Sequence, residues 1–261
     1  MMPRFEQARK FTVDLLSGPR VVFHHVPKCG GTSIAQALRL RYAVSFAGFP
    51  TPPIYRAVMA TEPAADEASR ARLVDEFQER LLLYYLYSDI RCIAGHVRFS
   101  QVAHNLFSKS YKFVTTLREP VSMMISHYFF LPRRSAEIFT SVDDIDAYLE
   151  SEEARHFGAV YPYYFNGGSA HDEPWSDAAM CKAKKNLRLL DVVGFVDDIP
   201  RFQRQLRDHV GLRLRIGHAN RSVASREDRK SVITPTVRRR IEELSAPNIE
   251  IYEFAKRELQ R

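Results

Sequence analysis

Short apolar runs and longer segments of helical periodicity alternate along this chain. Runs rich in β-branched or aromatic residues are typical of buried strands, and they occur at residues 21–26, 92–95, 112–117 and 192–196. Strands that alternate with helices predict a mostly parallel sheet covered by helices on both faces. The hydrophobic pattern therefore predicts an α/β fold.

Helical periodicity fills most of the sequence between these runs. Helices are predicted over residues 32–41, 66–87, 120–130, 177–190 and 198–210, with two more over 235–260 that are broken near Pro247. On the long helix 66–87, Leu73, Phe77 and Leu81 are expected to share the buried face. The proline-rich residues 46–63 are expected to be loop-like instead.

The composition is that of an ordinary globular protein, with 45% hydrophobic and 26% charged residues in a chain of 261. We expect a single domain over residues 1–261, with an N-terminal extension at 1–19 and C-terminal helices at 235–261. No segment approaches the roughly 18 apolar residues that span a bilayer, and residues 1–10 lack the apolar core of a signal peptide. Three cysteines without a CxxC pair favour a reducing compartment. The chain is therefore expected to be soluble and cytoplasmic.

The densest chemical signal lies between the first strand and its helix, where residues 25–33 read HVPKCGGTS. Two glycines let the backbone turn tightly and approach a ligand, and the following helix offers N–H groups and a positive dipole end to an anion. Lys28 adds a positive charge, and Thr32 and Ser33 add hydroxyl groups. The competing interpretation is a glycine turn followed by hydroxyl side chains that cap the helix.

A second signal follows the strand at residues 112–117. Arg118 stands at the carboxyl end of this strand, and Ser126 comes eight residues later in the predicted helix. One guanidinium and one hydroxyl can hold a single phosphate, and ligands of parallel sheets collect at the carboxyl ends of strands. The alternative is an ion pair between Arg118 and Glu119 beside a surface serine.

Together, the two motifs, about 85 residues apart, resemble those of the PAPS-dependent sulfotransferases (PAPS is 3′-phosphoadenosine-5′-phosphosulfate). The chain is most similar to the heparan sulfate (uronyl) 2-O-sulfotransferase type, over about residues 21–259. This resemblance implies a P-loop-like three-layer α/β/α fold and transfer of a sulfuryl group from PAPS to an acceptor hydroxyl, on a carbohydrate. It also implies that the protein can form a homo-oligomer, because members of that branch form trimers.

The resemblance assigns roles to particular residues. Lys28 would contact the oxygen that bridges phosphorus and sulfur, within a 5′-phosphosulfate loop formed by Lys28, Cys29, Gly30, Gly31, Thr32 and Ser33. Arg118 and Ser126 would hold the 3′-phosphate. In the basic segment 218–231, Arg221 and Ser222 would close over the 3′-phosphoadenosine.

Transfer to a hydroxyl needs a group that takes up its proton, and histidine suits this role near neutral pH. His96 is the candidate base because it directly follows the strand at residues 92–95. The resembling branch has His-Gly-His here, and this chain has Ala94-Gly95-His96, so only the second histidine is present. The competing candidates are His24, His25 and Glu119, and His127 is interpreted as a supporting group beside Ser126.

Other function classes stay open on the sequence alone. The net charge of +7 favours anionic partners, among them acidic glycans and nucleic acid, but no nucleic-acid recognition motif is present. A P-loop nucleotide kinase would place its lysine after the glycines rather than before them. A thiol enzyme would use Cys29, since a helix N-terminus stabilises a thiolate. No metal-ligand spacing occurs, and the aromatic segment 161–175 is interpreted either as part of the acceptor site or as core.

Overall fold

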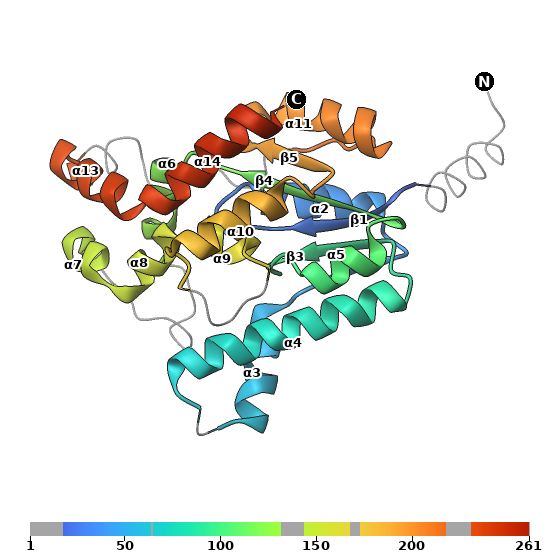
Figure 1. The fold of residues 1–261 in the computed structure, drawn as a ribbon, viewed down its shortest axis with the longest axis horizontal. Helices are drawn as coiled ribbons and strands as arrows, with labels where there is room; N and C mark the ends of the chain where they lie inside the picture. Colours follow the sequence, from blue (N-terminus) through green and yellow to red (C-terminus); the bar gives the residue numbers. More distant parts are fainter. Residues whose placement is uncertain (1–17, 64, 132–143, 168–172, 218–230, 261) are drawn as a thin grey trace.

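The computed structural model describes residues 18–63, 65–131, 144–167, 173–217 and 231–260. Within these ranges a five-stranded, all-parallel sheet has the strand order β2-β3-β1-β4-β5. The strands are β1 (Arg20–His24), β2 (Phe46–Gly48), β3 (Cys92–Gly95), β4 (Tyr111–Leu117) and β5 (Val192–Phe195). Helices cover both faces of the sheet (Figure 1), which confirms the predicted three-layer α/β/α fold.

The two helical layers differ in size. The smaller layer is formed by α2 (Gly31–Arg41), α11 (Ile199–Gln205) and the π-helical turn η3 (Leu206–Val210), whereas a short 3₁₀ turn, η2 (Val196–Asp198), precedes α11. The larger layer contains α3 (Thr51–Thr61), α4 (Glu67–Tyr87), α5 (Gln101–Phe107), α6 (Pro120–Tyr128), α7 (Ile145–Glu150), α8 (Glu152–Gly158), α9 (Val160–Phe165), α10 (Asp177–Leu187), α13 (Pro235–Leu244) and α14 (Ala246–Leu259). In Figure 1, α2 lies behind the sheet while α9 and α10 lie in front of it.

Alternation of side chains along the strands divides the core in two. On β1, Val21 and Phe23 pack into the core beneath α2 and α11, and Val22 packs into the larger core on the opposite face. All three side chains are fully buried, and each such burial is worth about 1.5–3 kcal/mol. Because both faces are covered, the strands read as continuous apolar runs, which is the pattern that the sequence shows.

The strand order makes β1 the point where the chain changes direction across the sheet. After β1 the chain passes through α2 to β2 on one side, returns to β3 beside β1, and then crosses to β4 on the other side. Ligands of parallel sheets bind at the carboxyl ends of strands at such a switch point. The segments that follow β1, β3 and β4 are therefore where a site is expected.

Residues 46–63 contradict the predicted loop, because they form β2 and α3. Pro52 and Pro53 lie in the first turn of α3, where a residue without an N–H group loses no helical hydrogen bond. The prolines therefore begin a helix here rather than prevent one. β2 has three residues, too few to show a periodic pattern.

The long helix α4 has the predicted length, but of the predicted face only Leu81 packs against the core, where it is partly buried. It begins after Asp66, whose side chain accepts a hydrogen bond of 2.7 Å from the Ser69 N–H. The fully buried positions are Leu82 and Leu86, whereas Phe77 is 41% exposed. The sequence could not select between these faces, because apolar residues lie on both sides of the helix.

The other predicted elements agree with the structure to within a few residues, whereas α7, α8 and α9 were not predicted. One difference is the predicted helix 198–210, which changes at residue 206 from α11 to the π-helical turn η3. The break predicted near Pro247 lies at Ser245, between α13 and α14. In the part of the chain that the structure describes, no helix is both long and apolar enough to cross a membrane.

Candidate functional site

The loop after β1 has left-handed backbone at two positions and leads directly into α2. Lys28 and Gly30 both have left-handed backbones, with φ of 63° and 71°, a conformation that costs glycine little. Gly30 is the N-cap of α2, where no side chain forms a capping hydrogen bond and the first turn holds no acidic residue. Thr32 and Ser33 lie inside α2 and not at its N-cap position, which is occupied by Gly30. The first turn of α2 itself therefore carries no side chain that neutralises the positive end of its dipole.

The helix after β4 begins differently. The Glu119 carboxylate caps α6, accepting hydrogen bonds from the N–H groups of Val121 at 2.9 Å and Ser122 at 2.8 Å. The ion pair expected between Glu119 and Arg118 is absent from the salt bridges of the described residues. Glu119 is thus accounted for by helix capping, and its carboxylate already neutralises the N-terminus of α6.

Two adjacent threonines of β4 hold the backbone that leads into the loop. The Thr115 hydroxyl donates to the His24 carbonyl at 2.7 Å, and the Thr116 hydroxyl donates to the Cys29 carbonyl at 2.9 Å. Both side chains are buried, so these hydrogen bonds are shielded from water and costly to lose. In the sequence, these threonines are recognisable only as ordinary strand residues.

Arg118 contacts the loop directly. Its Nη1 donates to the Lys28 carbonyl at 3.2 Å. Its backbone is held by the Tyr161 hydroxyl, which accepts from the Arg118 N–H at 2.8 Å and donates to the Arg118 carbonyl at 2.5 Å. Burial raises the pKa of Tyr161 well above its usual value, so the phenol stays neutral and can both donate and accept.

The side chain of Cys29 points away from the loop into the core. Its Sγ lies 3.5 Å from Met123 Sδ and 3.5 Å from the Tyr161 hydroxyl. Burial raises the pKa of the thiol to about 12, so the reactive thiolate is scarce at neutral pH. The burial of this thiol disfavours the thiol-enzyme interpretation and leaves the backbone of Cys29 to line the loop.

His96 is held in one tautomer. Its Nδ1 lies 2.8 Å from the His25 carbonyl oxygen, which can only accept a hydrogen bond. Nδ1 therefore carries the hydrogen, and Nε2 carries the lone pair. This is the form in which a half-buried histidine acts as a base through Nε2.

Two of the other histidines, the competing His24 and the neighbouring His127, are core residues. His24 is fully buried, its Nδ1 donates to the Val97 carbonyl at 3.0 Å, and burial lowers its pKa to about 4. His127 is also buried, with Nδ1 at 2.8 Å from the Tyr148 hydroxyl and its ring stacked at 3.8 Å on Phe157. Neither ring is placed to meet a substrate.

The ammonium group of Lys28 points toward the end of α6. Its Nζ lies 3.7 Å from the centroid of the Phe130 ring, a distance typical of a cation–π contact. Ser126 lies half-buried in the same helix, which begins two residues after Arg118. Lys28, Arg118 and α6 therefore lie together beyond the carboxyl ends of β1 and β4.

Some of the other predicted site residues lie outside the part of the chain that the structure describes. Arg221 and Ser222 lie outside the described residues, as do residues 168–172 of the aromatic segment. Within that segment, Tyr161, Tyr164 and Phe165 are buried. These three rings belong to the core, so the acceptor interpretation of the segment is wrong for them.

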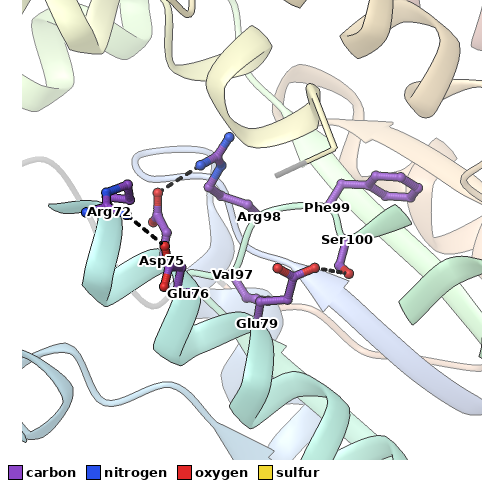
Figure 2. A pocket seen from close by; sticks show the side chains of 8 residues that line it. All are labelled: Arg72, Asp75, Glu76, Glu79, Val97, Arg98, Phe99 and Ser100. Carbon is purple, nitrogen blue, oxygen red and sulfur yellow. Dashed lines mark hydrogen bonds and ion pairs between the residues drawn. The ribbon is translucent and has the colours of Figure 1, made fainter. Parts of the chain in front are cut away.

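A small pocket lies between α4 and the four residues that follow His96 (Figure 2). Its volume of about 30 Å³ holds about two water molecules, which is far too little for a sugar ring. The pocket is lined by Arg72, Asp75, Glu76, Glu79, Val97, Arg98, Phe99 and Ser100. Arg98 crosses it to Asp75 at 2.8 Å and also donates to the Tyr163 carbonyl at 2.9 Å. These contacts of Arg98 in the pocket fix the segment after His96 to α4 and α9.

Three neighbouring strand ends bring the candidate residues together. His96 follows β3, Lys28 follows β1 and Arg118 follows β4, with β1 in the middle. In comparisons with known proteins, no family model matches this chain and no curated protein matches its sequence. The functional argument therefore depends on the chemistry of these residues and on the sequence motifs that contain them.

Proposed function

We propose that this protein is a sulfotransferase that moves the sulfuryl group of PAPS to an acceptor hydroxyl, on a carbohydrate. The observation that supports it most is the contact between Arg118 and the Lys28 carbonyl, which joins the two donor-binding motifs at adjacent strand ends. PAPS carries anionic groups at both its 5′ and 3′ ends, and each motif offers one cationic side chain.

The donor is proposed to bind along the edge of the sheet. The turn at Gly30 and the first turn of α2 would hold the 5′-phosphosulfate through backbone N–H groups and the helix dipole. Arg118 and Ser126 would hold the 3′-phosphate. Arg221 and Ser222 are proposed to contact the nucleoside from the segment after residue 217.

The proposed reaction is an in-line displacement at sulfur. The acceptor oxygen attacks sulfur while Nε2 of His96 removes its proton, and the bond between sulfur and the bridging oxygen breaks. The electron pair of that bond stays on the departing 5′-phosphate of 3′-phosphoadenosine-5′-phosphate. Lys28 stabilises this negative charge after its ammonium turns from Phe130 toward the leaving oxygen. Positioning and electrostatics supply the catalysis, as in phosphoryl transfer.

We also propose a reducing compartment such as the cytoplasm and an anionic glycan as the acceptor. All three cysteines are free thiols, and Cys29 and Cys92 are buried. Free buried thiols suit a reducing environment. The net charge of +7 supports attraction of an acidic glycan, with nucleic acid as the competing anionic polymer.

Titration calorimetry with 3′-phosphoadenosine-5′-phosphate tests the proposal, with ATP as the competing nucleotide. We expect micromolar binding of the bisphosphate and no comparable binding of ATP. Arg118→Ala should weaken this binding about 10- to 100-fold, because charge-assisted hydrogen bonds contribute about 1.5–3 kcal/mol. Arg204→Ala is the matched control, since Arg204 is an exposed arginine on α11. If the unaltered protein does not bind the bisphosphate, the proposed function is wrong.

A further inference from the structure

His25 touches both the candidate base and the donor loop. Its N–H donates to the Gly95 carbonyl at 2.9 Å, and its carbonyl accepts from His96 Nδ1 at 2.8 Å. Its ring also stacks on the His96 ring, with 4.2 Å between centroids and an angle of 27° between the planes. Backbone and side chain of His25 thus both fix His96.

The opposite contact of the His25 ring is with the start of α2. A Cβ added to Gly31 would overlap Cδ2, Nε2 and Cγ of His25, well inside the 3.0 Å below which Cβ contacts are essentially never found. Gly31 has no left-handed φ, so glycine is required here for space and not for backbone freedom. The ring of His25 therefore lies directly against the first residue of the donor-binding helix.

The ring acts through its shape and not through hydrogen bonds. Among the described residues, the hydrogen bonds of His25 are formed by its backbone and none by its ring nitrogens. Burial, with the nearby His96 and Lys28, lowers its pKa to about 2. The ring is consequently a neutral, flat spacer between His96 and the start of α2. In the proposed reaction these two groups must act together on the acceptor and the donor.

We infer that His25 is a positioning residue, which sets the distance between His96 and the donor-binding helix α2. The inference rests on the proposed sulfotransferase function. In-line transfer requires the base and the donor to be placed together, and a displacement of about 1 Å can cost about 100-fold in rate. Removal of the ring leaves His96 and the start of α2 free to shift relative to each other.

The first test compares His25→Ala with His25→Phe in a sulfuryl-transfer assay. His25→Ala should lower kcat about 10- to 100-fold while the affinity for 3′-phosphoadenosine-5′-phosphate changes less than about 3-fold. His25→Phe keeps a flat ring and the backbone carbonyl, so it should recover kcat to within about 5-fold of the unaltered protein. The control is His209→Ala, because His209 is an exposed histidine on η3. Full activity of His25→Ala, or equal losses in both variants, overturns the inference.

The second test uses the close approach of the ring to Gly31. Gly31→Ala should weaken binding of the bisphosphate at least about 10-fold, because its methyl group must displace the His25 ring or α2. The double variant His25→Ala with Gly31→Ala removes the obstacle, so its bisphosphate affinity should return to within about 3-fold, while kcat stays low. Its melting temperature should also exceed that of Gly31→Ala alone. Additive effects on both affinity and melting temperature would show that the two residues are not coupled.

These outcomes separate the proposed sulfotransferase function from the positioning role of His25. If the unaltered protein does not bind the bisphosphate, the sulfotransferase function fails and the role of His25 fails with it. If the unaltered protein binds it and transfers sulfuryl groups, but the variants behave additively, the function stands and only the inference about His25 is overturned.

Discussion

At the scale of single residues, His96 is oriented by a backbone carbonyl. The His25 carbonyl fixes a hydrogen on Nδ1. A carboxylate partner would stabilise the protonated imidazolium, whereas a neutral carbonyl does so less. In the neutral ring this hydrogen bond leaves the lone pair at Nε2, where the proposed reaction needs it.

Replacing His96 tests this base assignment. His96→Ala should lower kcat about 10²- to 10⁴-fold, the usual contribution of a positioned general base. Affinity for 3′-phosphoadenosine-5′-phosphate should change less than about 2-fold, because the donor is held by the other strand ends. Steady-state kinetics and calorimetry measure the two effects, with His209→Ala as the control. A matching loss of donor affinity would instead assign His96 to binding.

Tyr161 offers a second test at this scale. Tyr161→Phe removes the hydroxyl that pairs with both the N–H and the carbonyl of Arg118. Leaving buried polar groups without partners costs about 1–3 kcal/mol of stability, and a less constrained Arg118 should weaken bisphosphate binding about 3- to 10-fold. Urea unfolding and calorimetry measure these losses. Tyr84→Phe on the exposed surface of α4 is the control, and unchanged affinity in Tyr161→Phe would contradict the role given to Tyr161.

The sequence predicted the residues that stand in recognisable motifs and missed those that support them. Lys28, Arg118 and His96 follow strands directly, so their neighbourhood at one sheet edge could be inferred from the pattern alone. Tyr161 lies 43 residues from the Arg118 backbone that it holds. The ring of His25 is important because of its contact with Gly31. Such contacts depend on the packed structure, and no local pattern indicates them.

At the scale of elements, the apolar runs were sufficient to locate the four longer strands. The sequence failed at β2 and α3 because a three-residue edge strand has no periodicity and prolines at a helix start resemble a loop. It also failed on the face of α4, which contacts both α3 and α5. In each case the missing information lies in the neighbouring elements and not in the segment itself.

Arg98 links three elements across the small pocket, which makes it the residue to change at this scale. It connects the segment after β3 to Asp75 on α4 and to Tyr163 and Asn166 at α9. Arg98→Ala leaves the Asp75 carboxylate, whose pKa burial already raises, without its cationic partner. We expect a loss of about 2–4 kcal/mol in the free energy of unfolding.

The same pocket provides a control for this prediction. Arg72 also lines it (Figure 2), but its side chain is exposed and pairs with Glu76 at 3.3 Å within one helix. Arg72→Ala should therefore cost less than about 0.5 kcal/mol. Urea unfolding at neutral pH compares the two variants, and equal losses would show that Arg98 does not link the elements as described.

At the scale of the whole molecule, the C-terminal helix α14 supports the centre. Asn248 on α14 accepts from the Tyr161 N–H at 2.8 Å and donates to the Phe157 carbonyl at 2.8 Å. Tyr161 in turn holds Arg118, which contacts the loop after β1. The C-terminal helix thus helps to place the candidate donor site, although it lies far from that site in sequence. Damage to this helix is consequently expected to affect both stability and donor binding.

The stability of the whole molecule should depend on pH through a buried histidine. Burial lowers the pKa of His24 from its ordinary value of 6.5 to about 4. Between these two values the unfolded chain binds a proton that the folded protein excludes. The contribution of His24 is therefore complete above about pH 6.5 and is lost as the pH falls toward 4. From pH 7.5 to pH 5 this single group should remove about 2 kcal/mol from the free energy of unfolding.

Replacing His24 separates this effect from that of other titrating groups. His24→Asn keeps an amide that can donate to the Val97 carbonyl, as Nδ1 of His24 does, but it cannot titrate. The variant should be less stable at pH 7.5, yet it should lose about 2 kcal/mol less than the unaltered protein between pH 7.5 and pH 5, measured by urea unfolding. The exposed His209→Asn should change this pH dependence little. If His24→Asn and the unaltered protein lose the same stability on acidification, His24 is not held neutral by burial, and the packing of β1 beneath the loop would have to be reconsidered.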